Sequence, residues 1–266
     1  MQLSLSQKQT PRLQWLTQTG STNLDLIQLS EDENLPHFTV LATANQLAGR
    51  GRAGRVWQAP QDSALAISVL LKPQLTAALN LESLGWLPLL AGLAMSQTVA
   101  QLLPDSQVGV KWPNDVLVNH SKISGILTEL TTRGQELSVV VGAGVNITQT
   151  RQELPIETAT SLSIQGANLP MDLEARLDGV LARYLENLNR EYSAFAEAGF
   201  DARLSGLQAA VIKNCITLGR EVRAILPGDR ELLGTAVDID DSGRLILDVS
   251  GALVGVAAGD IVHLRH

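Results

Sequence analysis

The stretch Gln46–Trp57, QLAGRGRAGRVW, constrains the fold most, because of what it contains and what flanks it. It holds three glycines and three arginines and lies between two apolar runs, Phe38–Ala44 and Ala64–Leu71. Both runs have the length and composition of buried strands. Pro60 and the early start of the second run leave no room for a helix between them. The sequence therefore predicts a strand, a glycine-rich loop and a second strand.

The glycines of this loop and Val56 also spell G-x-G-x-x-G-x-V, a string found in dinucleotide-binding folds and protein kinases. A dinucleotide-binding fold needs a helix after the glycines and an acid about twenty residues on, whereas Leu70–Pro73 contains no acid. Lys72 lies near the place of the kinase lysine, but the sequence has neither H-R-D-x-x-x-x-N nor D-F-G. Both interpretations are therefore excluded.

The loop is locally cationic, since no Asp or Glu lies between Asn34 and Gln61. Glycines permit unusual backbone angles, and arginines supply fixed charge with bidentate hydrogen bonding. On this segment alone, a loop that folds over a phosphate-bearing ligand and a solvated basic loop both fit. We expect the free loop to be mobile, because ordering three glycines costs entropy and three arginines repel one another.

The whole chain has 266 residues, of which 45% are hydrophobic and 18% charged, as in a globular protein with one large core and a small second one. The net charge of -7 disfavours nucleic acid as a partner. Cys215 is the one cysteine and cannot form an internal disulfide, which predicts a reducing, cytoplasmic location. No signal-peptide core is present at the N-terminus.

Residues Ser83–Pro104 are uncharged and long enough to raise the question of a membrane span. Pro88 and several polar residues interrupt this segment, and Glu82 and Asp105 flank it. We therefore expect a buried core helix over Leu84–Leu103 and no membrane partner.

The remaining pattern predicts an α+β chain of two domains, 1–214 and 215–266. Apolar periodicity indicates a helix over Leu173–Ala198 with Gly199 as its C-terminal cap. Short strands are predicted at Val108–Lys111 and Asp115–Val118, and a hairpin at Ile123–Thr131 and Glu136–Gly142, joined by TTRGQ. After Thr217, four β-like runs alternate with Pro-Gly and Ser-Gly turns, which predicts a barrel-like module of about fifty residues. These runs are Glu221–Leu226, Leu233–Ile239, Arg244–Val249 and Asp260–Leu264.

Two further segments combine charged residues with strand signals. KWPNDVLV starts at Lys111, and its Trp-Pro step places Asn114 and Asp115 where a strand meets a loop. These two residues suit a turn, or Asp115 lies near a metal or an incoming amine. KISGILTEL starts at Lys122, which is either solvated or projects its charge into a pocket from the root of a buried strand. Gly125 would allow close backbone approach there.

A third segment, VVVGAGVNI over Val139–Ile147, is an apolar strand that ends in Gly142, Gly144 and Asn146. Such a pattern fits a strand that ends in a turn. It also fits a ligand that passes closely over the glycines and is recognised by the asparagine amide.

Together and in this order, these segments resemble the motifs of biotin–protein ligases. The matching residues are Ser21-Thr22-Asn23, Gln46–Trp57, Lys111–Asp115, Lys122–Glu129, Gly142–Asn146 and Ala159–Leu162. The resemblance covers most of the chain, and the Arg-Gly loop together with K-W-P-N-D is highly specific. It implies a class II synthetase-like catalytic domain with a mixed sheet and helices, followed by an SH3-like barrel. The terminal module departs from the family in having Gly259-Asp260 where Gly-Glu is usual.

The resemblance implies activation of biotin with ATP and Mg²⁺ to biotinyl-5′-AMP, then transfer to a lysine of a carrier protein. The implied carrier is the biotin carboxyl carrier protein of acetyl-CoA carboxylase. By matching position, the implied biotin-binding residues are Ser21, Thr22, Asn23, Gln46, Gly49, Arg50, Lys122 and Gly125. The implied ATP-binding residues are Arg50, Arg52, Trp57, Asn114, Lys122 and Asn146. The implied catalytic residues are Arg52, Lys122 and Asp115; the metal ligands stay unassigned.

The chemistry agrees with this set. Joining a carboxylate to the α-phosphate of ATP brings like charges together, which fixed cations offset. The mixed anhydride reacts with water, so a closing loop is needed to exclude it. Twenty residues precede Ser21, too few for the helix-turn-helix domain of family members that repress transcription. A lipoate- or octanoyl-transferring enzyme and a non-catalytic regulator that binds biotin or its adenylate remain as alternatives, and a homodimer is allowed.

Overall fold

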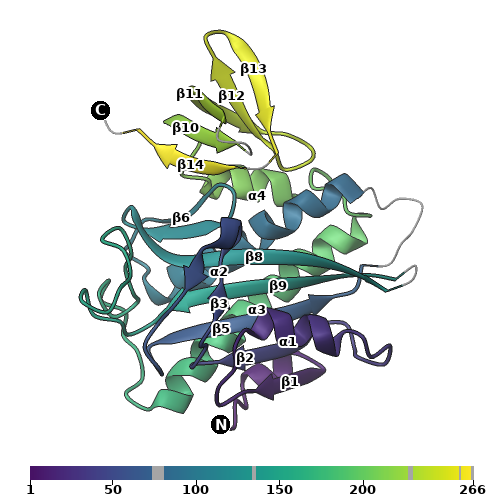
Figure 1. The fold of residues 1–266 in the computed structure, drawn as a ribbon, viewed down its shortest axis with the longest axis vertical. Coiled ribbons are helices and arrows are strands. Elements are labelled where there is room, and N and C mark those ends of the chain that lie inside the picture. The colour runs from purple at the N-terminus through teal and green to yellow at the C-terminus, as the bar shows by residue number, and fades with distance from the viewer. Residues whose placement is uncertain (74–80, 134–135, 227–229, 258, 265–266) are drawn as a thin grey trace.

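The computed structural model describes residues 1–73, 81–133, 136–226, 230–257 and 259–264. Its larger sheet has seven strands in the order β1-β2-β5-β9-β8-β7-β6 (Figure 1). The β1–β2 pair is parallel and the other neighbouring pairs are antiparallel, so the sheet is mixed as expected. In sheet order the strands are Arg12–Trp15, Thr39–Thr43, Ala64–Leu71, Glu136–Asn146, Ser121–Arg133, Asp115–Val118 and Val108–Lys111.

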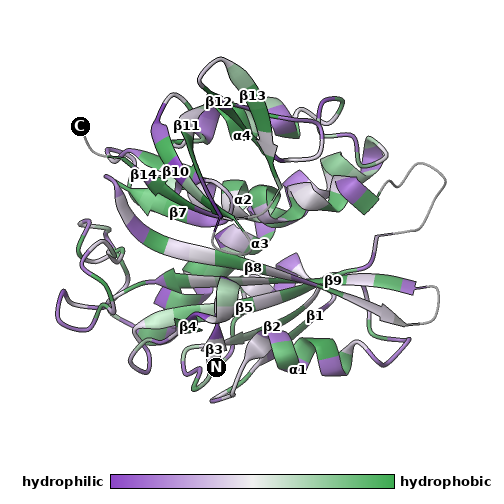
Figure 2. Ribbon diagram, turned by 45° about the horizontal axis from the view of Figure 1, so that its top comes forward, coloured by the Kyte–Doolittle hydropathy of each residue, from purple (hydrophilic) through white to green (hydrophobic). Residues whose placement is uncertain are grey.

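The sheet is a middle layer, because its central strands are buried on both faces. One face packs against α2 (Leu87–Leu102) and α3 (Leu173–Glu197), and the main core lies there. Helix α1 (Thr22–Leu29) covers part of the other face with a smaller core around Val140 of β9. Hydrophobic residues predominate in α2 and β2, as Figure 2 shows. Because successive side chains of a strand alternate between faces, Gly142 and Gly144 lie on the α1 face with Val140.

The uncharged segment forms a buried core helix, as predicted, but the helix starts later than Leu84. Residues Leu81–Trp86 form a 3₁₀ turn and α2 begins at Leu87. Pro88 explains this start, since its fixed φ and missing N–H are tolerated in the first turn of a helix. Within the described residues, no helix is both long and apolar enough to cross a membrane.

The other long predicted elements are present. The Asp172 carboxylate caps α3 by accepting from the Ala175 N–H at 2.8 Å, and Gly199 ends the helix with a φ of 68°. The hairpin is longer than predicted, because β8 starts at Ser121 and β9 extends to Asn146. Over its added residues β9 pairs with β5 as far as Asn146 and with β8 as far as Val145, and the added start of β8 pairs with β7. The tip of this hairpin, residues 134–135, lies outside the described residues.

The C-terminal part is an antiparallel five-stranded sheet in the order β13-β12-β11-β10-β14, consistent with an SH3-like module. In chain order, β10 to β14 are Glu221–Leu226, Arg230–Ile239, Leu245–Val249, Ala252–Val256 and Asp260–His263. The four predicted runs are strands, and β13 was not predicted. The Pro-Gly turn at residues 227–228 lies outside the described residues. Helix α4 (Leu207–Asn214), also not predicted, lies between the two sheets (Figure 1).

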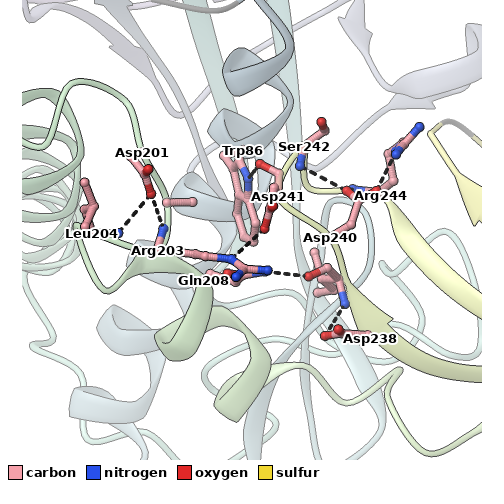
Figure 3. A network of polar contacts seen from close by, with 12 residues as sticks. Trp86, Asp201, Arg203, Leu204, Gln208, Asp238, Asp240, Asp241, Ser242 and Arg244 are labelled. Carbon is pink, nitrogen blue, oxygen red and sulfur yellow. Dashed lines mark hydrogen bonds and ion pairs between the residues drawn. The ribbon is translucent and has the colours of Figure 1, made fainter. Parts of the chain in front are cut away.

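The turn between β11 and β12 joins this module to the larger part of the chain (Figure 3). The buried Trp86 indole donates to the Asp241 carbonyl at 2.8 Å, and the Gln208 amide donates to the Ile239 carbonyl at 2.8 Å. The Trp112 indole reaches the Gly243 carbonyl of the same turn at 3.0 Å. The nearby Arg203–Asp241 ion pair is well exposed and contributes little to stability. The module is therefore held to the larger part of the chain mainly by buried side chains of that part, which donate hydrogen bonds to backbone carbonyls of the module.

Candidate active site

A cavity of about 580 Å³ opens between the Arg-Gly loop, the α1 face of the sheet and strand β14 of the C-terminal module. The predicted site residues line it together, with the exception of Gly49. Those lining it are Ser21, Thr22, Asn23, Gln46, Arg50, Arg52, Trp57, Asn114, Asp115, Lys122, Gly125 and Asn146. Motifs that are far apart in the chain thus meet around one space.

The Arg-Gly loop is a small hairpin. Strand β3 (Gly49–Arg50) pairs with β4 (Val56–Trp57), and a 3₁₀ turn over Arg52–Gly54 joins them. The Gly51 N–H donates to the Arg55 carbonyl at 2.7 Å and closes the turn. At Gly49 a Cβ would lie 2.4 Å from Gln46 Nε2 and 2.5 Å from the Trp57 carbonyl oxygen. Gly49 therefore lets two pocket residues approach each other instead of lining the pocket itself.

The start of α1 forms a polar end of the pocket. The Thr22 N–H donates to Gln46 Oε1 at 2.9 Å, and the Ser68 hydroxyl donates to Asn23 Oδ1 at 2.5 Å. Asn23 Nδ2 in turn donates to Glu129 Oε2 at 2.9 Å. Sequence reasoning missed Ser68. The signal for it was a single serine inside the apolar run ALAISVLL, since a buried hydroxyl in such a strand requires a polar partner.

The glycines of β9 make room for protein side chains as well as for a ligand. A Cβ on Gly142 would lie 2.3 Å from Asn23 Oδ1, and one on Gly144 would lie 2.5 Å from the Trp57 ring. Both glycines line the cavity, so a ligand that passes over them stays a prediction. Asn23 and Trp57 lie over them, and these two side chains face the cavity.

Replacing Gly144 with alanine should displace the Trp57 ring, because the new methyl group would overlap it. Over-packing costs roughly 1–3 kcal/mol, so we expect the tryptophan fluorescence to change. Because the family resemblance implies that Trp57 contacts ATP, we also expect the KM for ATP to rise about tenfold. The control is Gly255→Ala in β13, where the nearest atom would lie 3.6 Å from the added Cβ. Changed fluorescence with an unchanged KM for ATP in Gly144→Ala would show that the ring does not contact the nucleotide.

The arginines of the loop each have an oxygen partner. Arg50 forms an ion pair with Glu129 at 3.0 Å, and Arg55 forms one with Asp260 of β14. Arg52 donates to Asn114 Oδ1 at 3.2 Å and to the Gly259 carbonyl at 3.4 Å. These contacts offset the repulsion expected among the three arginines. They also bring in two residues of the terminal module that the sequence did not assign to the site.

The Lys122 ammonium lies 2.6 Å from Asp115 Oδ1, so this lysine projects into the pocket and is not simply solvated. Gly125 lies beside both, since a Cβ there would be 3.4 Å from Lys122 Nζ and 3.6 Å from Asp115 Oδ1. Asn114 faces Arg52 and also donates from Nδ2 to the Ile126 carbonyl at 2.8 Å. The K-W-P-N-D and K-x-x-G-I-L segments are therefore held together by an ion pair and a hydrogen bond.

Asn146 is buried and positions the segment that follows it. Its Nδ2 donates to the Thr160 carbonyl at 2.9 Å, and its Oδ1 accepts from Gln149 Nε2 at 2.8 Å. Lys122 pairs with Ala159 in an isolated bridge. The ATSL segment is thus fixed against the strand that carries the pocket lysine.

Within the described part of the chain, no group of three or more His, Cys, Asp or Glu side chains forms a metal site. Of the residues that the structure describes, two with carboxylates line the cavity, Asp115 and Asp260. Mg²⁺ usually binds through one or two carboxylates together with substrate phosphates. The residues present therefore fit a Mg²⁺ ion that arrives with a nucleotide.

The chain is similar to known proteins both in sequence and in structure. Residues 12–146 match the model of the biotin/lipoate A/B protein ligase family, and residues 217–264 match that of the biotin protein ligase C-terminal domain. The biotin–[acetyl-CoA-carboxylase] ligase of Mycobacterium tuberculosis is 38% identical over 96% of this chain and 90% of that protein. The enzyme of the same name from Paracoccus denitrificans is 33% identical over 87% of this chain and 92% of that protein. Among solved structures, the biotin protein ligase from Aquifex aeolicus in complex with biotin and ATP has a TM-score of 0.72 at 30% identity, covering 96% of this chain and 100% of that one.

Proposed function

This chain belongs to the biotin protein ligase family, and from its cavity we infer that the Arg-Gly loop folds over an acyl-adenylate. Its activity is the ATP-dependent activation of biotin and the transfer of biotin to a lysine of a biotin carboxyl carrier protein. In the first step, a biotin carboxylate oxygen bonds to the α-phosphorus of ATP and pyrophosphate leaves. In the second, the neutral amine of the carrier lysine attacks the acyl carbon, the bond from that carbon to the phosphate oxygen breaks, AMP leaves with the electron pair, and the nitrogen releases a proton.

The observation that carries the residue assignments is the convergence of five cations on one cavity. Arg50, Arg52, Arg55, Lys111 and Lys122 line it, and ion pairs with Glu129, Asp260 and Asp115 balance three of them. The remaining excess of positive charge suits the developing charge where carboxylate and phosphate meet. We assign Lys122 and Arg50 to the carboxylate and its junction with the phosphate, and Arg52 to the adenylate phosphate.

The two ends of the cavity differ in character, which sets the orientation of the ligands. The polar end holds Ser21, Thr22, Asn23 and Gln46, and we propose that it binds the biotin ring, while Gly125 would contact biotin next to the Lys122–Asp115 pair. The Trp57 ring over Gly144 offers an aromatic face for the adenine, and Asn114 and Asn146 line the same cavity. Mg²⁺, when bound with ATP, neutralises part of the phosphate charge. Asp115 is the carboxylate next to Lys122 that would hold the metal or receive the incoming lysine.

The proposal includes a catalytic domain over 1–214 and an SH3-like domain over 215–266. The partner is the carrier protein. We propose no nucleic acid as a second partner, because the net charge is -7. We propose no membrane either, because the apolar segment Ser83–Pro104 contains the buried helix α2. A cytoplasmic location follows from the single cysteine, which is buried. A homodimer is compatible with this assignment.

Trapping the intermediate tests the proposal. The protein is incubated with MgATP, biotin and hydroxylamine, and biotinyl hydroxamate is measured. Hydroxamate that depends on both ATP and biotin is expected. Its formation with lipoate or octanoate in place of biotin would favour a lipoate-type enzyme, and bound biotin without hydroxamate would favour a non-catalytic regulator.

The Arg55–Asp260 pair links the loop to the terminal module but should contribute modestly. The two side chains are 56% and 41% exposed, and exposed pairs are worth about 0–1 kcal/mol. We expect Asp260→Asn to raise the KM for ATP by no more than about fivefold, while kcat is unchanged. Added salt should shrink the difference, since it screens exposed charges. Steady-state kinetics at two ionic strengths measure this, and a loss of kcat would assign Asp260 a direct part in the chemistry.

A further inference from the structure

Lys111 and Arg55 line the cavity but have no ligand assigned by the family resemblance, and of these two Arg55 is paired with Asp260. Lys111 is the last residue of β6, in register with Asp115 of β7. Val110 and Trp112 on either side are buried in the main core. Because side chains alternate along an extended chain, Lys111 points to the opposite face, where it lines the cavity half-buried.

The position of Lys111 is fixed from both sides. The Ile216 N–H donates to the Val110 carbonyl at 2.9 Å, which ties β6 to the chain entering the terminal module. The Trp112 N–H donates to Thr217 Oγ1 at 3.1 Å. Lys111 therefore lies on a strand where the larger sheet meets the C-terminal module, and not on a free loop.

Among the described residues, the Lys111 ammonium has neither a hydrogen-bond partner nor an ion pair. Each of the other four cations of the cavity has a partner within the protein. Asp115, its cross-strand neighbour, is taken by Lys122 at 2.6 Å. Burial lowers the pKa of Lys111, partly countered by Asp115 and Asp260. Nearby His263 has its pKa lowered to about 4 by burial and by Lys111, so this histidine is neutral near pH 7. A half-buried ammonium without a carboxylate partner leaves room for an anion from outside the protein.

The surroundings indicate which anion. Lys111 is the cross-strand neighbour of Asp115, which holds Lys122, and it is also within electrostatic range of Arg55 and of Asp260 in β14. Lys122 and Arg50 are assigned to the carboxylate and its junction with the α-phosphate, and Arg52 is assigned to the adenylate phosphate. A cation beyond that junction, toward β14, meets the part of a triphosphate that extends past the α-phosphate. An ammonium is a compact, hydrated point charge that suits phosphate oxygens.

We propose that Lys111 binds the β- and γ-phosphates of ATP and stabilises pyrophosphate as it leaves, an inference that rests on the adenylating function proposed above. In this step the bond between the α-phosphorus and the oxygen bridging to the β-phosphorus breaks. Its electron pair stays on that oxygen, while the biotin carboxylate oxygen forms the new bond to phosphorus. No proton is transferred, so the lysine acts through its charge alone.

The test separates the two half-reactions. Lys111→Gln, Lys111→Arg and the wild-type chain are compared in biotin-dependent pyrophosphate release from ATP. They are also compared in transfer to the carrier from preformed biotinyl-5′-AMP, which contains no β- or γ-phosphate. Lys213→Gln, on the exposed end of α4 and outside the cavity, is the matched control.

We expect Lys111→Gln to raise the KM for ATP and the inhibition constant of added pyrophosphate by about 10- to 100-fold, the usual weight of a hydrogen bond to a charged group. Transfer from preformed biotinyl-5′-AMP should stay at the wild-type rate, and Lys111→Arg should recover part of the loss. Unchanged constants for ATP and pyrophosphate would overturn the assignment, and so would an equal loss in both half-reactions. A wild-type chain that releases no pyrophosphate with biotin would instead overturn the proposed function itself.

Discussion

Replacing Lys122 with alanine should lower the rate of adenylate formation by about 100- to 1000-fold, because removing one preorganised donor at a developing charge typically costs that much. Lys122 lies on β8 and extends into the cavity, where its ammonium contacts Asp115 at 2.6 Å. The alanine variant would lose the cation at the carboxylate–phosphate junction and leave a carboxylate there that repels both substrates. Biotin-dependent pyrophosphate release measures the effect.

The fold should survive this change, since Lys122 is not part of either hydrophobic core. Thermal unfolding of the variant checks this point. Lys72→Ala is a suitable control, because Lys72 follows a central strand but contacts the Glu33 carbonyl away from the cavity. A soluble Lys122→Ala protein that forms adenylate at the wild-type rate would remove Lys122 from the catalytic residues.

The sequence predicted the parts of this site that depend on local signals. Strands on either side of the Arg-Gly loop follow from apolar runs, and the positions of Asn114, Asp115 and Lys122 follow from Pro113 and from the start of a buried strand. Family resemblance supplied the expectation that these segments meet. It did not supply the geometry, since the sheet order brings β9 between β5 and β8 although β9 follows both in the chain.

Other features had no local signal. Asp260 and Gly259 reach Arg55 and Arg52 across about two hundred residues of chain, and this contact depends on the docking of the module, to which Trp86, Trp112 and Gln208 contribute. Similarly, Gly142 and Gly144 are placed in the strand interior by pairing on both sides, so their purpose depends on Asn23 and Trp57 from other segments. A single sequence shows that a glycine is present, but tertiary packing decides what lies over it.

Replacing Arg52 with glycine should release the intermediate. Arg52 bridges the loop to both neighbouring units, through Asn114 at 3.2 Å and the Gly259 carbonyl at 3.4 Å, and it has no carboxylate partner among the described residues. Burial lowers its pKa, but a guanidinium stays charged. We have assigned it to the adenylate phosphate. Hydrogen bonds to charged groups contribute roughly 1.5–3 kcal/mol, so biotinyl-5′-AMP should escape about 10- to 100-fold more often from Arg52→Gly.

Chemistry should continue in this variant, because Lys122 and its partner Asp115 are untouched, while the added glycine loosens the turn over residues 52–54. Escaped adenylate would acylate exposed lysines without regard to the carrier. The measurement is biotinylation of an unrelated lysine-rich protein mixed with Arg52→Gly, with the wild-type chain, or with Arg55→Gly. The last variant removes an arginine and adds a glycine in the same loop, but Arg55 already has Asp260 as its partner, so less adenylate should escape from it. If Arg52→Gly still forms adenylate yet labels the bystander no more than the wild-type chain does, Arg52 does not retain the intermediate.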